Sequence, residues 1–169
     1  IDLANINKEL RRQIIEREQI EEKLRYKQRQ ADKELEMAAT IQQTLIPRYS
    51  PRIDPIRIAW RFEPCDLIGG DIFNFQYTGK NHISFYMFDV CGHGVSAALI
   101  ASAVSQFIQT SCSTMLAETD TPRPEAVLNN LERAFPFERF DSFFTIVYIT
   151  IDYAKGCLFY SSAGHPPLI

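Results

Sequence analysis

The sequence predicts an α+β fold in which antiparallel hairpins and helices form layers, with one long helix preceding the globular part. Residues 3–45 carry apolar side chains at steps of three and four, which is typical of a helix. Runs that alternate apolar and polar residues, as strands do, flank short turns, and helical patterns occur as one block between them. Parallel winding would instead alternate single strands with single helices, so the sequence does not favour it.

The composition divides the chain into two parts. Residues 1–46 are rich in charge and contain neither Gly nor Pro, whereas residues 47–169 are mixed and aromatic. We therefore expect a helical coiled-coil linker over 1–46 and one globular domain over 47–169, which is long enough to bury a core. Because the chain opens on Ile1 with a helix already under way, we expect it to be a piece of a longer protein.

Charge and cysteine content exclude several classes of protein. The formal net charge of -3 is interspersed along the chain, which does not indicate a nucleic-acid surface. The 4 cysteines have no paired spacing, so a cytoplasmic location is expected rather than a disulfide framework or a zinc site. No run of about 18 apolar residues is present, so we expect no membrane span within this piece, and any anchor would lie upstream.

The long helix is predicted to pair with a second copy of itself. A helix this polar is not stable alone, so it must dimerise or lie on a domain; a solvated helix on its own globular domain is the alternative. Pro47 ends it. The apolar side chains that form the heptad seam are Leu3, Ile6, Leu10, Ile20, Leu24, Ala31, Ala38, Ile41 and Leu45.

The globular part is predicted to contain five strands and two helices. An apolar stripe after Gly94 indicates a helix to about residue 115, and a second helix follows from Pro124 to about residue 133. The expected strands cover residues 56–62, 71–77, a run ending at Asp89, 142–151 and 157–162, with hairpin loops at 78–81 and 152–156.

Two aspartates stand beside glycine turns and are candidate ligands of a cation. Asp71 closes the turn Gly69-Gly70-Asp71, and Asp89 ends an apolar run. Mg²⁺ and Mn²⁺ take oxygen ligands, and glycines let the backbone approach a ligand closely. The alternative is that both carboxylates only cap turns or the helix that follows.

Five segments occur in a defined order along the chain. They are 34–47, 64–71, which ends in Gly69-Gly70-Asp71, 89–99, which begins Asp89-Val90-Cys91-Gly92-His93-Gly94, 141–145 and 163–168. Together they resemble the bacterial metal-dependent serine/threonine phosphatases of the PPM family, in their SpoIIE/RsbU-like group, and residues 34–47 are similar to the lead-in helix of that group. The resemblance implies an antiparallel β-sandwich flanked by α-helices, in αββα layers, of which this chain carries about the first two-thirds.

The resemblance also implies a binuclear Mn²⁺ or Mg²⁺ centre. Asp89 is expected to bridge the two ions, and Asp71 with the Val90 backbone carbonyl to complete the shell of one of them. His93 is a candidate proton donor to the leaving group. His165 is expected to have a structural hydrogen-bonding role, and His82 is expected to lie on the surface.

Two departures from the family pattern stand out. A second acid often follows the Gly-Gly-Asp aspartate by three residues, and Asn74 occupies that position here, which could weaken an accessory metal contact. The remaining metal aspartates of the family lie after the Ala-Gly-His-Pro-Pro turn, and this chain ends at Ile169. We therefore expect the chain to hold about half of the metal centre.

The resemblance implies a protein-serine/threonine phosphatase of a bacterial signalling protein. Its expected substrate is a small phosphorylated regulator, an anti-sigma-factor antagonist of the STAS type, in a partner-switching pathway. An upstream sensor or receiver domain and a homodimer through the linker helix are also expected. A catalytically degenerate scaffold is one alternative. A diguanylate cyclase is the other, because residues 69–73 resemble the Gly-Gly-Asp-Glu-Phe signature, although Ile72 replaces its acid.

Overall fold

The computed structural model describes residues 3–54, 56–64, 66–118 and 123–168, with the backbone alone for 112–118. The chain divides into two compact units, Ile1–Ala38 and Ala39–Ile169. The predicted boundary between linker and domain, after residue 46, stays a prediction. In chain order the elements are α1 (Leu3–Gln43), β1 (Ile72–Gly79), β2 (His82–Val90), α2 (Gly94–Glu118), α3 (Pro124–Ala134), α4 (Phe137–Phe140), β3 (Phe144–Asp152) and β4 (Cys157–Ala163).

The predicted long helix is confirmed as α1, which ends two residues before the expected end. Ala39 is its one buried residue among those described, and its apolar side chains are largely exposed, as Leu24 at 62% illustrates. Ion pairs one turn apart, Glu9–Arg12 and Arg17–Glu21, support the helix locally. Within the described residues, no helix has both the length and the hydropathy that crossing a bilayer would require.

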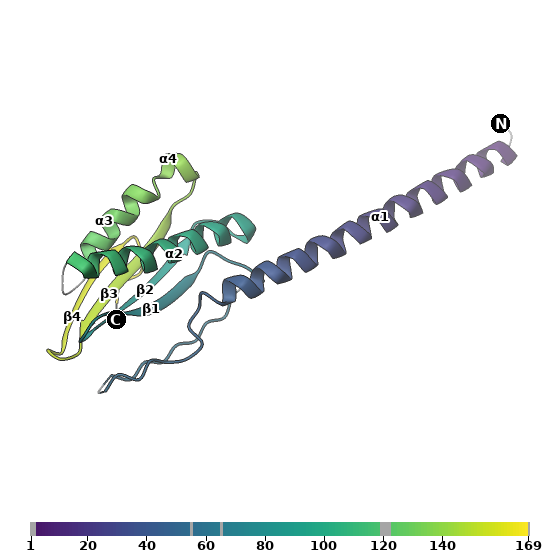
Figure 1. Ribbon diagram of the computed structural model, residues 1–169. Helices are drawn as coiled ribbons and strands as arrows, with labels where there is room; N and C mark the ends of the chain where they lie inside the picture. Colours follow the sequence, from purple (N-terminus) through teal and green to yellow (C-terminus); the bar gives the residue numbers. More distant parts are fainter. Residues whose placement is uncertain (1–2, 55, 65, 119–122, 169) are drawn as a thin grey trace. The chain divides into compact units, whose positions relative to one another are not determined.

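The four strands form one antiparallel sheet in the order β1-β2-β3-β4, so each strand pairs with its neighbour in sequence (Figure 1). Strand predictions for 71–77, the run to Asp89, 142–151 and 157–162 are confirmed, and so is the insertion of helices between the two hairpins. The one-turn helix α4 was not predicted, because four residues show no helical period. The antiparallel sheet with helices confirms the predicted α+β class.

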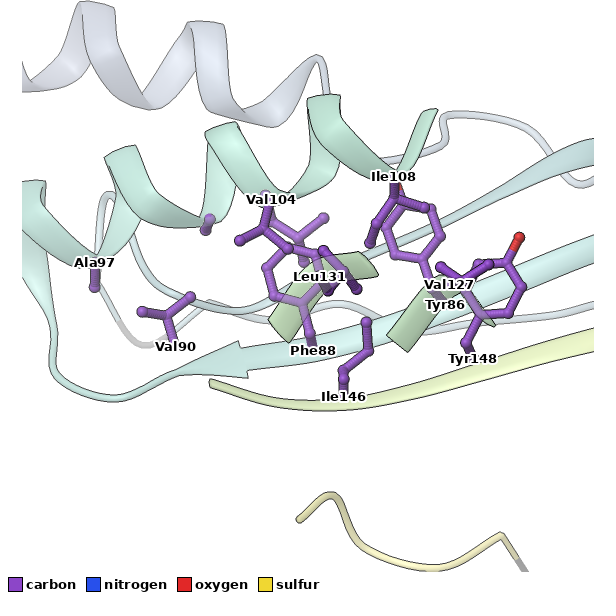
Figure 2. Close-up of a cluster of buried hydrophobic side chains, with 12 residues drawn as sticks. Tyr86, Phe88, Val90, Ala97, Val104, Ile108, Val127, Leu131, Ile146 and Tyr148 are labelled. Atoms are coloured by element: carbon purple, nitrogen blue, oxygen red, sulfur yellow. The ribbon is translucent and has the colours of Figure 1, made fainter. Parts of the chain in front are cut away.

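Helices α2 and α3 cover one face of the sheet and enclose the core (Figure 2). Alternation along β2 sends every second side chain to this face, where Tyr86, Phe88 and Val90 are at most 2% exposed. The helices contribute apolar side chains that pack against this face of the sheet. The other buried members of the cluster are Ile72, Ala97, Ala101, Val104, Ile108, Val127, Leu131, Ile146 and Tyr148.

The prediction of a strand over residues 56–62 is wrong. Its alternation is real, since even-numbered side chains are half-buried and odd-numbered ones exposed, but the only pairing there is an isolated bridge between Ile53 and Ile56. Aromatic side chains of the segment instead pack against β1. Trp60 lies 5.5 Å from Phe73 and 6.1 Å from Phe75, measured between ring centroids. Alternation of exposed and half-buried side chains therefore indicates an extended segment with one face covered. To form part of a β-sheet, the segment would also need a neighbouring strand to pair with.

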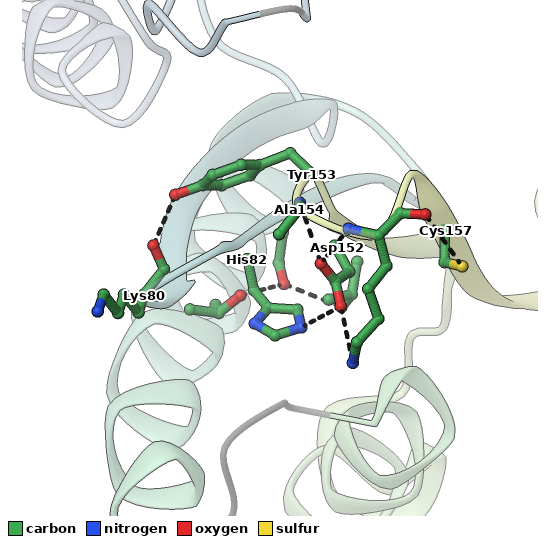
Figure 3. Close-up of polar contacts among 10 residues, drawn as sticks. Lys80, His82, Asp152, Tyr153, Ala154 and Cys157 are labelled. Atoms are coloured by element: carbon green, nitrogen blue, oxygen red, sulfur yellow. Dashed lines mark hydrogen bonds and ion pairs between the residues drawn. The ribbon is translucent and has the colours of Figure 1, made fainter.

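At the opposite end of the sheet from Val90, Asp152 organises the turns of both hairpins (Figure 3). Its carboxylate accepts hydrogen bonds from the Ala154 and Lys155 N–H groups at 3.1 and 3.0 Å and pairs with His82 Nε2 at 3.4 Å. The Lys155 N–H bond is the main cause that lowers the pKa of Asp152. His82 was predicted to lie on the surface, and that prediction is wrong: its side chain is 13% exposed because it packs on this carboxylate.

Candidate metal centre

Asp71 and Asp89 are brought together by the register of β1 and β2. Ile72 pairs with Phe88, so one further step places Asp71 directly opposite Asp89. The ladder does continue in that direction, because the Val90 N–H donates to the Gly70 carbonyl at 3.4 Å. Cross-strand neighbours point to the same face of a sheet, with Cβ atoms about 4.5–5.5 Å apart. The two carboxylates therefore share one site on the face away from α2 and α3.

The pKa of Asp71 reflects its burial and its closeness to Asp89. Its burial, followed by the neighbouring Asp89 charge, raises the pKa of Asp71 above its usual range, and the nearby His165 opposes the shift. Two carboxylates held together repel each other unless a proton or a cation lies between them. The pair thus favours a bound cation.

Gly70 lets the backbone of the two strands approach closely at this site. A Cβ built on Gly70 would stand 2.6 Å from the Val90 carbonyl oxygen and 3.0 Å from the Val90 Cβ, which no real side chain tolerates. Gly69 has nothing within 4 Å of the same test atom. Gly70 therefore sets the position of the Val90 carbonyl, the predicted backbone ligand.

The turn after Asp89 is fixed by the loop that precedes β3. The Cys91 N–H donates to the Phe143 carbonyl at 2.8 Å, and the Ser142 hydroxyl donates to the Cys91 carbonyl at 3.4 Å. Gly92 adopts a φ of 101°, which L side chains rarely adopt. The chain can therefore reverse direction immediately beyond the carboxylate.

The last segment joins the same end of the sheet through Thr145, which pairs with Asp89 across β2 and β3. The Thr145 hydroxyl and His165 Nδ1 share a hydrogen bond of 2.9 Å, and Gly164 bridges to Ile146. The expected hydrogen-bonding role of His165 is confirmed by this contact. No pattern in the sequence indicated that His165 lies close enough to oppose the shift in the pKa of Asp71.

A cavity of about 170 Å³ opens beside the two carboxylates. His93 lines it, immediately before α2, so the structure places this candidate proton donor at the same cavity as Asp71 and Asp89. Its remaining wall is largely apolar. The other lining residues are Gln42, Gln43, Ile46, Phe62, Pro64, Asp66, Leu67, Ile68, Gly69, Gly70 and Gly92.

Two amide side chains that the sequence did not single out as site residues tie the end of α1 to this region. Gln42 Nε2 donates to the Gly69 carbonyl at 2.7 Å, and the Gly69 N–H donates back to Gln42 Oε1 at 3.1 Å. Asn74 Nδ2 donates to the Leu45 carbonyl at 2.7 Å. Residues from each of the five motif segments, with Gln42 and Leu45 from the first, therefore lie near one end of the sheet.

The donors present fit part of a hard-cation site. Two carboxylates and a backbone carbonyl are the oxygen ligands that Mn²⁺ and Mg²⁺ accept. Asp89 is among the causes that raise the pKa of Asp71, after burial, so the two carboxylates interact. In the part of the chain that the structure describes, no three His, Cys, Asp or Glu side chains gather into a metal-binding group. The assignment of Asp71, Asp89 and Val90 as ligands, and of His93 as a catalytic residue, stays a prediction.

Comparison with known proteins identifies relatives of the whole chain. The chain is 32% identical over 146 residues to phosphoserine phosphatase RsbU of Bacillus subtilis, covering 85% of this chain and 41% of that protein. It is 27% identical over 143 residues to phosphoserine phosphatase RsbP of the same organism, covering 81% and 34%. The chain thus spans about two-fifths or less of the length of these relatives.

A solved structure shares the fold. The SiaA-PP2C domain of Pseudomonas aeruginosa superposes with a TM-score of 0.63 at 17% identity, over 80% of this chain and 55% of that one. The family described as Stage II sporulation protein E (SpoIIE) matches residues 79–169, more than half of the sequence. The chain therefore belongs to the SpoIIE family of PPM phosphatase domains.

Proposed function

We propose that this chain is part of a metal-dependent protein-serine/threonine phosphatase module that hydrolyses phosphoserine or phosphothreonine on a small regulatory protein. The observation that carries the proposal is the cross-strand pair Asp71 and Asp89 at one cavity. Its relatives RsbU and RsbP are both named phosphoserine phosphatases. Because the chain spans only part of each, its activity is inferred from the site and from the likeness together.

Each residue of the centre has a proposed task. Asp89 would bridge two divalent cations, Mn²⁺ or Mg²⁺, and Asp71 with the Val90 carbonyl would complete the shell of one. When bound, such a pair lowers the pKa of an attacking water and neutralises charge on the phosphoryl oxygens. His93, at the cavity wall, would protonate the departing serine oxygen. The glycine turns leave room for the phosphoryl group to reach the carboxylates.

We propose the regulator to be a phosphorylated STAS-like anti-sigma-factor antagonist, acted on in partner switching in the cytoplasm. An upstream sensor or receiver domain in the same protein would control the module, and two copies would pair through α1. The exposed apolar seam of α1 supports pairing, since Leu10 is 50% and Leu24 62% exposed in the single chain. Burying such a seam is what drives a coiled coil to form.

A scaffold with the same fold but no catalysis is the second candidate. The observation that favours it is the small number of carboxylates that converge among the described residues. Both candidates predict binding of a phosphorylated regulator, but only the phosphatase predicts release of phosphate that depends on Mn²⁺.

The deciding experiment compares the full chain with Asp89→Asn, using a phosphoserine-containing STAS protein and measured amounts of Mn²⁺. We expect phosphate release by the wild type and a loss of at least about 10²-fold in the variant, since even outer-shell substitutions at metal sites cost 10–100-fold. Asp54→Asn, an exposed aspartate away from the cavity, is the matched control. Substrate binding without any Mn²⁺-dependent release would favour the scaffold, and full activity in Asp89→Asn would remove Asp89 from the mechanism.

A further inference from the structure

Asp71, Asp89 and Thr145 form a row across one end of the sheet. Thr145 pairs with Asp89 in the register of β2 and β3, and Asp71 comes one step beyond the pairing of Ile72 with Phe88. Cross-strand neighbours point to the same face of a sheet, so the three side chains share the face away from α2 and α3. The Thr145 hydroxyl is therefore the next polar group beside the two carboxylates.

His165 is bound to the Thr145 end of this row. Its Nδ1 and the Thr145 hydroxyl share a hydrogen bond of 2.9 Å, and the residue is half-buried. The backbone of His165 is held as well, because its carbonyl accepts a hydrogen bond from the Ser162 hydroxyl at 3.3 Å and the preceding Gly164 bridges to Ile146. Ring and backbone are thus both fixed, as the groups of a preorganised site are.

His165 and the cavity reach the carboxylates from different segments. The cavity wall comes from residues before β1 and from the turn after β2, whereas His165 follows β4. The His165 ring is nevertheless close enough to oppose the rise in the pKa of Asp71. A phosphoryl group that entered the cavity and reached Asp71 and Asp89 would therefore meet His93 at the cavity wall and His165 beyond Thr145.

The hydrogen bond to Thr145 decides which nitrogen of the His165 ring can act on a ligand. The bond made by one imidazole nitrogen sets which nitrogen carries the proton. When the Thr145 hydroxyl donates to Nδ1, Nε2 carries the proton of the neutral ring, and it also carries one in the charged ring. Nε2 is then an N–H donor in either state, so its action does not depend on the titration of the ring. Hydrogen bonds from N–H groups to phosphoryl oxygens are among the strong ones, because the acceptor is charged.

We propose that the Thr145 hydroxyl donates to Nδ1 of His165 and thereby presents the Nε2–H group to a non-bridging oxygen of the substrate phosphoryl group at Asp71 and Asp89. His165 is then a catalytic residue, since it touches the substrate, and Thr145 is a positioning residue. The inference deepens the proposed phosphatase function and rests on it. It gives the half-buried ring of His165 a task beyond the packing of its own turn.

Two amide substitutions in the full chain separate this task from a purely structural one. Asn places its amide near the position of Nδ1, so His165→Asn keeps the hydrogen bond to Thr145 and loses the Nε2 donor. Gln reaches the position of Nε2, so His165→Gln keeps a donor there and loses the bond to Thr145. Thr145→Val removes the hydroxyl at a similar shape, and Thr145→Ser keeps it. His82→Asn replaces a histidine at the opposite end of β2 and is the matched control.

The first readout is the nitrogen NMR spectrum of the imidazole rings, recorded with Mg²⁺ present while inorganic phosphate is added. We expect the neutral His165 ring to carry its proton on Nε2 in the wild type and in Thr145→Ser, and to become a mixture of tautomers in Thr145→Val. Phosphate should shift the Nε2 resonance of His165 and leave that of His82 unchanged. A proton on Nδ1, or a His165 resonance that phosphate does not move, would overturn the proposal.

The second readout is phosphate release from a phosphoserine-containing protein at saturating Mn²⁺. We expect kcat to fall by about 10²-fold in His165→Asn, as when one oxyanion donor is removed from other enzymes, and by less in His165→Gln. Thr145→Val should lower kcat, whereas Thr145→Ser and His82→Asn should retain it. A purely structural His165 predicts the opposite order of the two amide variants, and that order, or full kcat in His165→Asn, would refute the catalytic role. If the wild type releases no phosphate, the proposed function fails, and the NMR titration still decides whether His165 binds the anion.

Discussion

The carboxylates of Asp71 and Asp89 face each other at the open end of the β1–β2 hairpin, opposite residues in a register that also pairs Ile72 with Phe88. Neighbouring carboxylates on one face repel each other, and burial increases the cost of keeping Asp71 charged. The metal-free site therefore lowers the stability of the fold. A cation bound between the two carboxylates would reverse the sign of that contribution.

Asp71→Asn is expected to stabilise the metal-free protein at neutral pH. The pKa of Asp71 is raised in the folded state, so its favourable contribution is present below its ordinary value of 3.8 and is lost as pH rises through the folded value. The variant should thus unfold at a higher temperature than the wild type at pH 7, by a margin that shrinks on acidification. Adding Mn²⁺ should raise the unfolding temperature of the wild type more than that of the variant. A variant less stable than the wild type in metal-free buffer would contradict this account.

Gly70→Ala is expected to destabilise the protein, because the added Cβ would stand 2.6 Å from the Val90 carbonyl oxygen. Overpacking of this kind typically costs about 1–3 kcal/mol. Gly69→Ala is the matched control, since nothing lies within 4 Å of its Cβ, and a change within about 0.5 kcal/mol is expected there. Denaturant unfolding of both variants measures the difference. Equal stabilities would mean that the strands separate easily at this point.

Asp152→Asn is expected to lower stability at neutral pH and to have progressively less effect in acid. The lowered pKa of Asp152 means that its contribution is present above its ordinary value of 3.8 and is lost as pH falls through the folded value. The Ala154 and Lys155 N–H groups, the Lys155 ammonium and His82 all contact this carboxylate. Urea unfolding from pH 7 to pH 3 should show the two curves converging. A gap that widened on acidification would contradict the assignment.

Leu24→Glu is expected to weaken self-association of the chain. Leu24 belongs to the apolar seam of α1 and is 62% exposed in the single chain, so a charge there would have to be buried in a coiled-coil interface. Gln19→Glu places the same charge at an exposed position away from the seam and its flanks and serves as the control. Sedimentation equilibrium of the three proteins measures the dimer dissociation constant. A wild type that remains monomeric at high concentration would refute pairing through α1.

Local patterns were sufficient for most of the fold. The change from period two to a helical period after Gly94, the turn residues at 152–156 and the absence of Gly and Pro before Pro47 each depend on neighbours in the sequence. The elements they predicted are present within a few residues of the expected bounds. The pairing within each hairpin, β1 with β2 and β3 with β4, followed because a short loop joins antiparallel neighbours, whereas the pairing of β2 with β3 across the inserted helices did not follow from local patterns.

Local patterns failed where a partner distant in sequence decides the outcome. Residues 56–62 alternate as a strand does but rest aromatic rings on β1 without joining the ladder. His82 was predicted to lie on the surface, yet the pairing of β2 with β3 places Asp152 opposite it. In both cases the deciding neighbour comes from another part of the chain.

By itself the sequence determined the residue types of the candidate centre, two aspartates beside glycine turns within an ordered set of motifs. Only the tertiary structure decided that Asp71 and Asp89 are cross-strand neighbours, that His165 reaches Thr145, and that Gln42 holds Gly69. The physical reason is that strand register and long-range side-chain hydrogen bonds depend on how separate segments pack. The spacing of residues within one segment does not indicate how that segment packs against another.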